Sequence, residues 1–218
     1  MLFHPRFSIH SWHSGSVNEP WMFPESTHLI RALLRLRMAL IPYFSHLFRA
    51  SARSCDPVLM PVFVQFETED FECRDDYLLG PDLLAAPVLE QGQKWRQVLL
   101  PKGTSWFFFP TMELCTSITQ VEAPLGTAVF FVRAGSVIPF DPQYWAGRDF
   151  QCPSLMVFPP VKDENVSFDS YTIIFERNLI SVNSKNVLIA LPETEKRPVA
   201  KGIDHGVFQK LRFVLIQN

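Results

Sequence analysis

The sequence has little charge and no cluster of basic residues. Charged residues make up 19% of the 218 residues, and the formal net charge is −2. A chain with scattered basic side chains lacks the electrostatic footprint of a nucleic-acid-binding protein. No apolar run approaches the ~20 residues that a transmembrane helix requires, and the first residues lack the layout of a signal peptide. We therefore expect no nucleic-acid partner and no membrane partner, and the compartment stays open.

Cysteine is also scarce, and its spacing excludes the usual metal-binding pattern. The four cysteines form no C-x-x-C pair, so neither a zinc site nor a disulfide framework is indicated. Free cysteines are among the most buried residue types, so we expect isolated buried thiols. No pattern indicates a cofactor. The cysteines are Cys55, Cys73, Cys115 and Cys152.

Glycine is rare, whereas proline and phenylalanine are abundant. The chain has 9 glycines, 18 prolines and 20 phenylalanines, and 47% of its residues are hydrophobic. This composition favours a globular chain of short strands with irregular connections. The length allows one large domain or two small ones.

One long helix is predicted over residues 27–51, with Ser26 or Thr27 as its N-cap. Pro42 should kink this helix, because proline removes a backbone hydrogen bond and its ring clashes with the preceding turn. The apolar stripe of the helix must pack on something large, since exposed it would exceed the patch that monomers usually tolerate. We therefore expect self-association through this helix. The stripe runs through Leu33, Leu40, Ile41 and Phe48.

Short apolar runs separated by turn signals follow the helix, which is typical of β-sandwiches. A more relaxed stretch at residues 141–153 indicates a linker between two groups of strands. An additional strand is expected before the helix, at residues 7–10. The other expected strands are residues 62–66, 83–89, 97–100, 105–109, 128–140, 155–158, 171–177, 179–182, 187–191 and 207–216.

Four segments, taken in order, resemble glycoside hydrolase family 31, the family of α-glucosidases and α-xylosidases. They are Leu36-Arg37-Met38-Ala39-Leu40-Ile41-Pro42-Tyr43-Phe44, residues 61–66, the run from Asp75 to Leu89, and Arg133-Ala134-Gly135-Ser136-Val137-Ile138-Pro139.

The resemblance implies a mainly β chain that begins with the end of a (β/α)8 barrel, comprising its last strand and long helix. Proximal and distal antiparallel β-sandwich domains follow. The implied boundaries are residues 1–62 for the barrel remnant, 63–140 for the proximal domain and 141–218 for the distal domain.

The activity implied by the family is retaining, exo-acting hydrolysis of α-linked carbohydrates. The family's nucleophile and its acid/base are aspartates on the fourth and sixth barrel strands, and no residue of this chain matches either motif. We therefore expect a C-terminal portion of such a hydrolase, with no catalytic residue of its own, no metal and no cofactor, and inactive alone.

One residue matches a position that contacts substrate in the family, and a second candidate lies in the same loop. His10 corresponds to the histidine after the eighth barrel strand, which contacts hydroxyls of the sugar in the −1 subsite, although Ser8 stands where the family commonly has arginine. Trp12, in the same loop, is a candidate to stack on a sugar, and packing on the rim of the barrel is its alternative role. The adjacent Asp75 and Asp76 are not a catalytic pair by this reasoning, because neighbouring side chains on a strand point to opposite faces. Capping a turn or pairing with a local arginine is their expected role.

Two other interpretations stay open. The chain is alternatively a non-catalytic β-sandwich protein derived from the family, which binds carbohydrate or another partner. A third interpretation is that a second polypeptide supplies the barrel and both catalytic aspartates. Substrate specificity depends on barrel loops, so the sequence does not identify the sugar or the linkage.

Overall fold

A computed structural model of the chain describes residues 2–7, 19–66, 75–141 and 154–161, together with the backbone of five further strands between residues 165 and 216. The described part is mostly strand, as the sequence predicts, with its long helices near the N-terminus. The helices are η1 Pro20–Met22, α1 Pro24–Ala39, α2 Ile41–Ser54 and α3 Val62–Gln65. The strands are β1 Leu59–Pro61, β2 Tyr77–Leu79, β3 Leu83–Ala85, β4 Trp95–Val98, β5 Trp106–Phe108, β6 Glu113–Cys115, β7 Thr119–Glu122, β8 Phe130–Arg133, β9 Val137–Phe140, β10 Ser154–Val157, β11 Asn165–Phe168, β12 Tyr171–Glu176, β13 Leu179–Val182, β14 Val187–Pro192 and β15 Leu211–Ile216.

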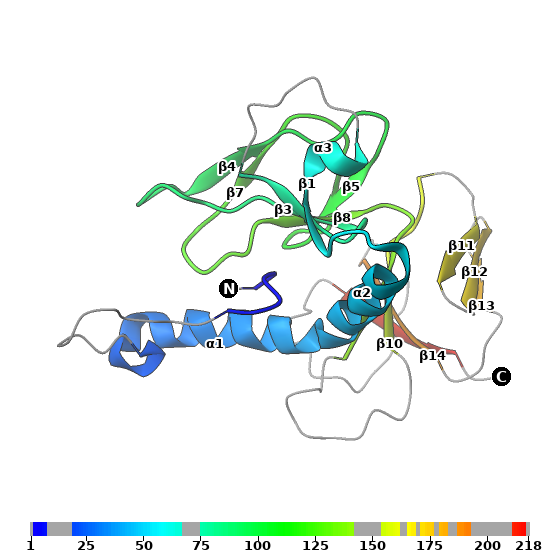
Figure 1. The fold of residues 1–218 in the computed structure, drawn as a ribbon, viewed down its shortest axis with the longest axis horizontal. Helices are drawn as coiled ribbons and strands as arrows, with labels where there is room; N and C mark the ends of the chain where they lie inside the picture. Colours follow the sequence, from blue (N-terminus) through cyan, green and yellow to red (C-terminus); the bar gives the residue numbers. More distant parts are fainter. Residues whose placement is uncertain are drawn as a thin grey trace.

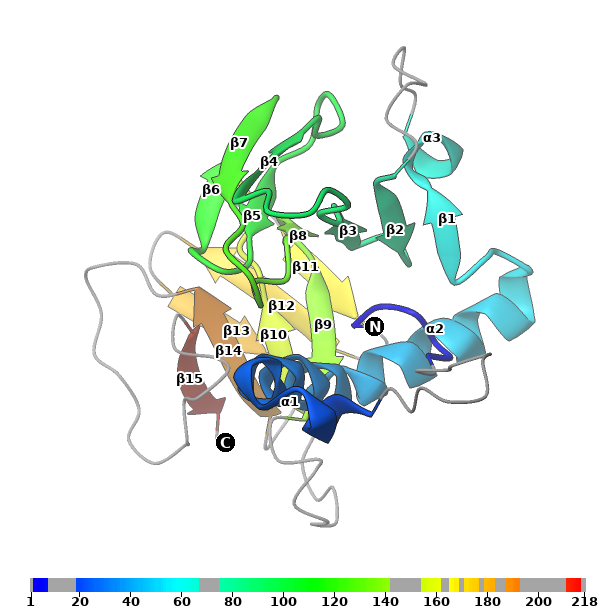
Figure 2. The same cartoon turned by 90° about the vertical axis from the view of Figure 1, so that its left-hand side faces the viewer.

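The described strands form four sheets. A six-stranded sheet has the order β1-β2-β3-β8-β5-β6, and a separate two-stranded ribbon pairs β4 with β7. A four-stranded sheet, β15-β14-β10-β9, and a three-stranded sheet, β11-β12-β13, contain the C-terminal strands. Helices α1 and α2 run along one side of this assembly, with the six-stranded sheet above them in Figure 1 and β9 and β10 reaching down towards them in Figure 2.

The middle strands of the six-stranded sheet are buried on both faces. Successive side chains of a strand point to opposite faces, so each strand contributes to two cores. One core lies against the helices, and the other lies beneath the β4–β7 ribbon. The first core includes Leu79, Leu83, Phe130 and Val132, which pack with Leu36, Leu40, Tyr43 and Leu47 of the helices. The second includes Leu78, Leu84 and Phe131, which pack with Val98, Trp106 and Val121.

The predicted kink is confirmed as a break between two helices. Leu40 lies between α1 and α2 with φ −87° and ψ 1°, and Pro42 lies in the first turn of α2. The break frees the carbonyl of Ala39, which accepts a hydrogen bond of 2.8 Å from the backbone N–H of Asp141. Loss of helical continuity thus allows the chain after β9 to dock onto the helices.

The predicted N-cap of this helix is wrong. Phe23 occupies the cap position and Pro24 the first turn, where a missing N–H costs nothing. The hydroxyl of Thr27 instead donates to the carbonyl of Pro20 at 2.9 Å, and so ties α1 to η1.

The apolar stripe is only partly exposed, contrary to the expectation from the sequence. Leu40 is 1% exposed, because strands of the same chain cover it. Leu33 and Ile41 are half-buried, and Phe48 is exposed. The proximal strands therefore provide part of the large surface that the helix needs.

A polar joint connects α2 to the turn between β2 and β3. The Tyr43 hydroxyl donates to the Leu79 carbonyl at 3.0 Å. Asp82 pairs through Oδ1 with Nη2 of Arg133 at 3.1 Å, and its carbonyl accepts from the Arg133 N–H at 2.9 Å. Burial raises the pKa of the Asp82 carboxyl, and the charge of Arg133 opposes that rise. Burial also raises the pKa of Tyr43, so its hydroxyl remains a donor.

The strand predicted at residues 62–66 is instead the short helix α3. Strand β1 ends at Pro61, opposite Tyr77 of β2, so the following residues have no ladder partner in that sheet. Phe63 and Val64 are exposed in the helical turn. A β-branched and aromatic segment forms a strand only where a neighbour pairs with it, and none does here.

The expectation of buried thiols fails at Cys55. This residue is exposed and ends α2 in the left-handed conformation, with φ 64°. Cys115, on the edge strand β6, is half-buried, whereas Cys73 and Cys152 lie outside the described residues.

Replacement of Gly80 tests the joint between α2 and the sheet. Gly80 has φ +59°, and a Cβ there would lie 2.3 Å from Cδ2 of Leu47 and 2.8 Å from the Tyr43 hydroxyl. Gly80→Ala should therefore combine left-handed strain with overpacking and lower the free energy of unfolding by about 3 kcal/mol, measured by urea denaturation. Gly92→Ala is the control, because Gly92 has φ +80° with nothing within 4 Å, and it should cost only about 1 kcal/mol. Equal losses in the two variants would contradict the close packing at Gly80.

Candidate functional site

The two residues expected to contact sugar, His10 and Trp12, lie outside the described residues. So do residues 8–10 of the expected strand before the helix, while Phe7 is described as exposed. Residues 2–7 show how the chain just before this candidate site is held.

Arg37 of α1 anchors the N-terminal segment. Its guanidinium donates from Nη2 to the Pro5 carbonyl at 2.8 Å and from Nη1 to the Leu2 carbonyl at 3.0 Å. The same guanidinium lies 5.4 Å from the ring centroid of Phe44. Phe3 inserts beside these groups, with its ring edge-on to Phe130 at 4.9 Å between centroids. The chain segment that precedes the candidate sugar site is therefore held against α1 and the six-stranded sheet.

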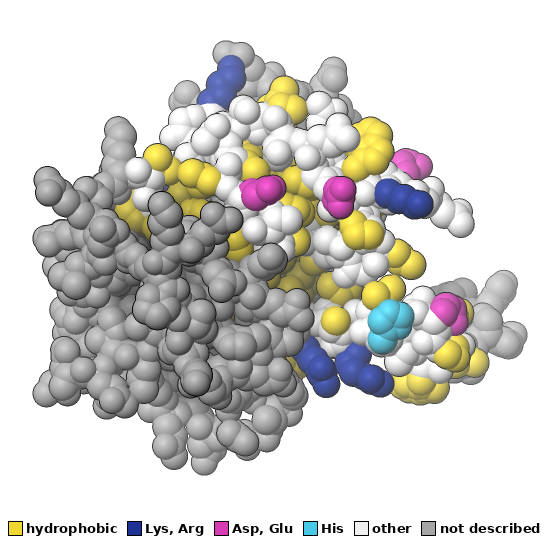
Figure 3. Space-filling model, turned by 180° about the vertical axis from the view of Figure 1, so that it is seen from behind, with side chains coloured by type: hydrophobic (Ala, Val, Ile, Leu, Met, Phe, Trp, Pro, Cys, Tyr) yellow, Lys and Arg dark blue, Asp and Glu magenta, His cyan; other side chains and the backbone are white. Residues whose placement is uncertain are grey.

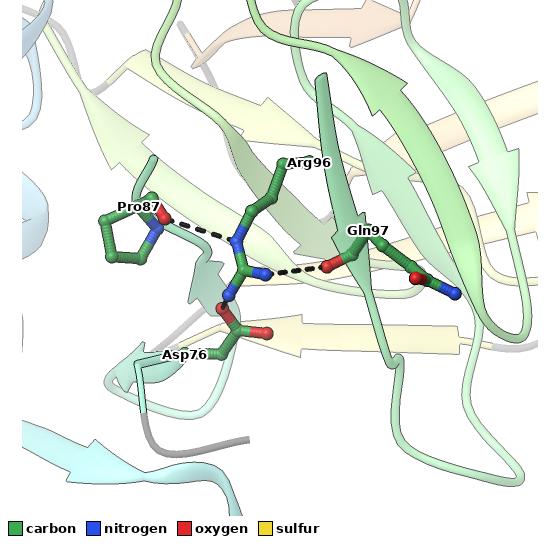
Figure 4. Close-up of polar contacts among 4 residues, drawn as sticks. All are labelled: Asp76, Pro87, Arg96 and Gln97. Carbon is green, nitrogen blue, oxygen red and sulfur yellow. Dashed lines mark hydrogen bonds and ion pairs between the residues drawn. The ribbon is translucent and has the colours of Figure 1, made fainter. Parts of the chain in front are cut away.

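The carboxylates of Asp75 and Asp76 have different environments. Asp75 is exposed, whereas the side chain of Asp76 is 2% exposed and its Oδ1 lies 2.9 Å from Nη2 of Arg96. Figure 4 shows the guanidinium of Arg96 between three acceptors, since it also donates to the carbonyls of Pro87 at 3.2 Å and Gln97 at 3.0 Å. One cation thus joins the start of β2, the segment after β3 and the strand β4.

This arrangement differs from that of a glycosidase pair. A retaining mechanism needs two carboxyl groups ~5–5.5 Å apart on either side of the scissile bond. Asp76 is held by a cation in a buried site, and Asp75 points to solvent. The sequence predicted a local arginine partner, but Arg96 lies 20 residues away on another strand, and no short-range pattern could have identified it.

The described residues contain neither a metal-binding cluster nor a membrane-spanning helix. Those residues bring together no group of three or more His, Cys, Asp or Glu side chains that could hold a metal ion. None of the helices among them has the length and hydropathy that crossing a bilayer requires.

Comparison with protein-family models gives two matches along the chain. Residues 1–47 match the TIM-barrel domain of glycosyl hydrolases family 31, and residues 55–138 match the C-terminal domain of glycosyl hydrolase family 31. The first match ends in α2, and the second covers the six-stranded sheet and the β4–β7 ribbon.

Curated relatives and solved structures agree with these matches. Neutral alpha-glucosidase C of Homo sapiens is 36% identical over 143 residues, which are 63% of this chain and 16% of that protein. Alpha-glucosidase of Saccharolobus solfataricus is 25% identical over 203 residues, covering 92% of this chain and 27% of that protein. The GH31 dextranase of Flavobacterium johnsoniae, solved with glucose, superposes with a TM-score of 0.74 at 24% identity, over 84% of this chain and 27% of that one.

The chain thus spans less than a third of the length of these relatives. The order of the two matched domains agrees with the order of the helices and sheets in the structure. The chain belongs to glycoside hydrolase family 31, of which it comprises a C-terminal portion.

Proposed function

We propose that this chain forms the C-terminal part of a retaining, exo-acting α-glycosidase. The observation that carries the proposal is the match to a barrel domain followed by a C-terminal domain, on a chain whose helices pack directly on the sheet of the second match. The relatives are named as α-glucosidases, which supports an α-linked glucoside as the substrate class.

The division into domains is part of this proposal. Residues 1–62 contribute the end of the barrel, residues 63–140 the proximal β domain, and residues 141–218 the distal β domain. The two β domains are joined through β9, which ends the proximal region and pairs antiparallel with β10 of the distal one.

The substrate-facing residues in this proposal are His10 and Trp12. In a complete barrel, the His10 imidazole donates to or accepts from a sugar hydroxyl, and the Trp12 indole packs against a sugar ring. Support comes from their place within residues 1–47, which match the barrel domain. The two catalytic aspartates belong to barrel strands that this chain does not supply.

The first test is an assay of the purified chain with 4-nitrophenyl α-D-glucopyranoside. We expect no release of nitrophenol above a heat-denatured control, because no pair of carboxylates in the chain matches the nucleophile and the acid/base. Turnover that co-elutes with the chain would contradict the proposal that this chain does not supply the catalytic aspartates. Activity that appears only with a co-purifying polypeptide would indicate that a partner supplies the barrel.

The second test concerns Asp76, to which we assign a structural role. Asp76→Ala should lower the free energy of unfolding by about 3 kcal/mol, because it leaves the largely buried Arg96 without its carboxylate. Asp75→Ala is the matched control, and since Asp75 is exposed it should change stability by less than about 0.5 kcal/mol. Denaturation monitored by circular dichroism measures both. Indistinguishable midpoints would refute the structural role.

The chain also exposes apolar side chains where it would meet the rest of a barrel. The apolar surface left on the helical region includes Trp21, Met22, Phe23, Leu34 and Phe48. The N-terminal end of α1, at the lower right of Figure 3, shows hydrophobic side chains on its surface beside charged ones. We propose that the isolated chain self-associates through this surface, because monomers rarely expose apolar patches above a few hundred Å².

Size-exclusion chromatography with light scattering tests this self-association. The unmodified chain should elute as a dimer or larger species, and the double variant Leu34→Ser with Phe48→Ser should shift towards the monomer. Ile118→Ser is the control, because Ile118 is 60% exposed between β6 and β7, outside the helical region, and it should leave the elution unchanged. A monomeric unmodified chain would rule out this surface as a self-association site.

A further inference from the structure

The β4–β7 ribbon presents a face of distinctive chemistry to solvent. Trp95 pairs with Glu122 and Gln97 pairs with Gln120 across the two antiparallel strands. All four side chains are exposed, whereas Val121, between Gln120 and Glu122, and Val98, which follows Gln97, are buried in the second core. The alternation of the strands therefore gathers one indole, two amides and one carboxylate on the outer side of the ribbon.

The inner side of the ribbon is firmly anchored. Arg96, between Trp95 and Gln97, points inward to the Asp76 carboxylate and the Pro87 carbonyl, while the side chain of Gln97 extends away from the guanidinium (Figure 4). The backbone N–H of Ala123 donates to the Lys94 carbonyl at 2.7 Å and extends the pairing beyond the strand ends. The outer side chains thus stand on a preorganised support, which lowers the entropic cost of binding a ligand.

The dimensions of this face suit a sugar. Directly opposed side chains lie ~5 Å apart, and alternate residues along a strand lie ~7 Å apart, so the four groups surround an area similar to that of a pyranose ring. The exposed fraction of Trp95 is 49%, which leaves a flat, electron-rich surface for the C–H groups of a sugar face. The amides and the carboxylate can donate to or accept from the hydroxyls around the ring.

Other ligand classes fit less well. A protein interface needs about 800 Å² on each partner with an apolar, charge-poor centre, and this face has a single large apolar side chain. Nucleic acid requires cations to neutralise phosphates, and the ionised group on the face is the carboxylate of Glu122. A neutral ligand with many hydroxyls matches an indole surrounded by amides and a carboxylate.

We propose that the outer face of the β4–β7 ribbon is a non-catalytic binding site for a glucan chain. One glucose unit stacks on Trp95, and its hydroxyls bond with Gln97, Gln120 and Glu122. The choice of an α-linked glucan rests on the proposed function, but the site lies within the described C-terminal part and needs no barrel.

Native affinity electrophoresis of the full chain in gels with and without soluble starch tests the proposal. Mobility in the starch-free gel is the reference, so self-association does not affect the comparison. We expect starch to retard the unmodified chain, and Trp95→Ala to raise the apparent Kd by about tenfold or more. Trp21→Ala is the matched control. Trp21 is more exposed than Trp95, but it lies in the helix η1 and not on a strand paired with amide side chains. Its replacement should therefore leave the retardation unchanged.

A second variant separates stacking from folding. Gln97→Ala with Gln120→Ala keeps the indole and the inner anchors, so it should fold normally and bind starch more weakly by about threefold, as the loss of exposed hydrogen bonds predicts. The proposal is overturned if the unmodified chain is not retarded, if Trp95→Ala binds like the unmodified chain, or if Trp21→Ala loses binding equally. A failure here leaves the hydrolase assignment intact, since that assignment is judged by the nitrophenyl assay.

Discussion

Leu78 and Leu79 are neighbours in β2 and enter two different cores, and this double burial of the central strands organises the described structure. The same division recurs at Leu83 and Leu84 of β3. Both faces of the sheet exclude water, so each face needs a cover. Helices α1 and α2 cover one face, and the β4–β7 ribbon covers the other. The Tyr43 hydroxyl bond, the contacts of Arg96 and the outer face of the ribbon all lie at these two covers.

The cover formed by the ribbon depends on Arg96. Its guanidinium meets Asp76, Pro87 and Gln97, so a single side chain connects the first strand after the helices with the outermost ribbon. Charge-assisted hydrogen bonds are stronger in such a largely buried site than at the surface, and an unpaired carboxylate there would be costly. Of the two carboxylates that look most like catalytic groups in the sequence, Asp76 therefore contributes to the support of a surface that faces solvent.

Much of the fold could be predicted, because strands that are buried on both faces leave a recognisable apolar run in the sequence. Strands buried on both faces appear as continuous apolar runs. The run at residues 83–89 contains β3 in its first half, and the run at 128–140 contains β8 and β9, separated by a turn. The break at Leu40 followed from Pro42. Residues 62–66 could not be assigned correctly, because strand formation needs a partner that the sequence does not reveal. The exposed strands β6 and β7 were missed, since their polar outer residues interrupt the apolar pattern.

The sequence by itself determined the family and the position of most strands, and it proposes His10 and Trp12 as sugar contacts, because these inferences depend on residue types at fixed spacing. The run from Asp75 to Leu89 carried most of that information. The tertiary structure alone decided that Leu40 is covered, that Asp76 faces Arg96, and that Trp95 shares a face with Gln97, Gln120 and Glu122. These facts depend on contacts between residues about 20 or more positions apart. Chain folding, and no local pattern, brings such residues together.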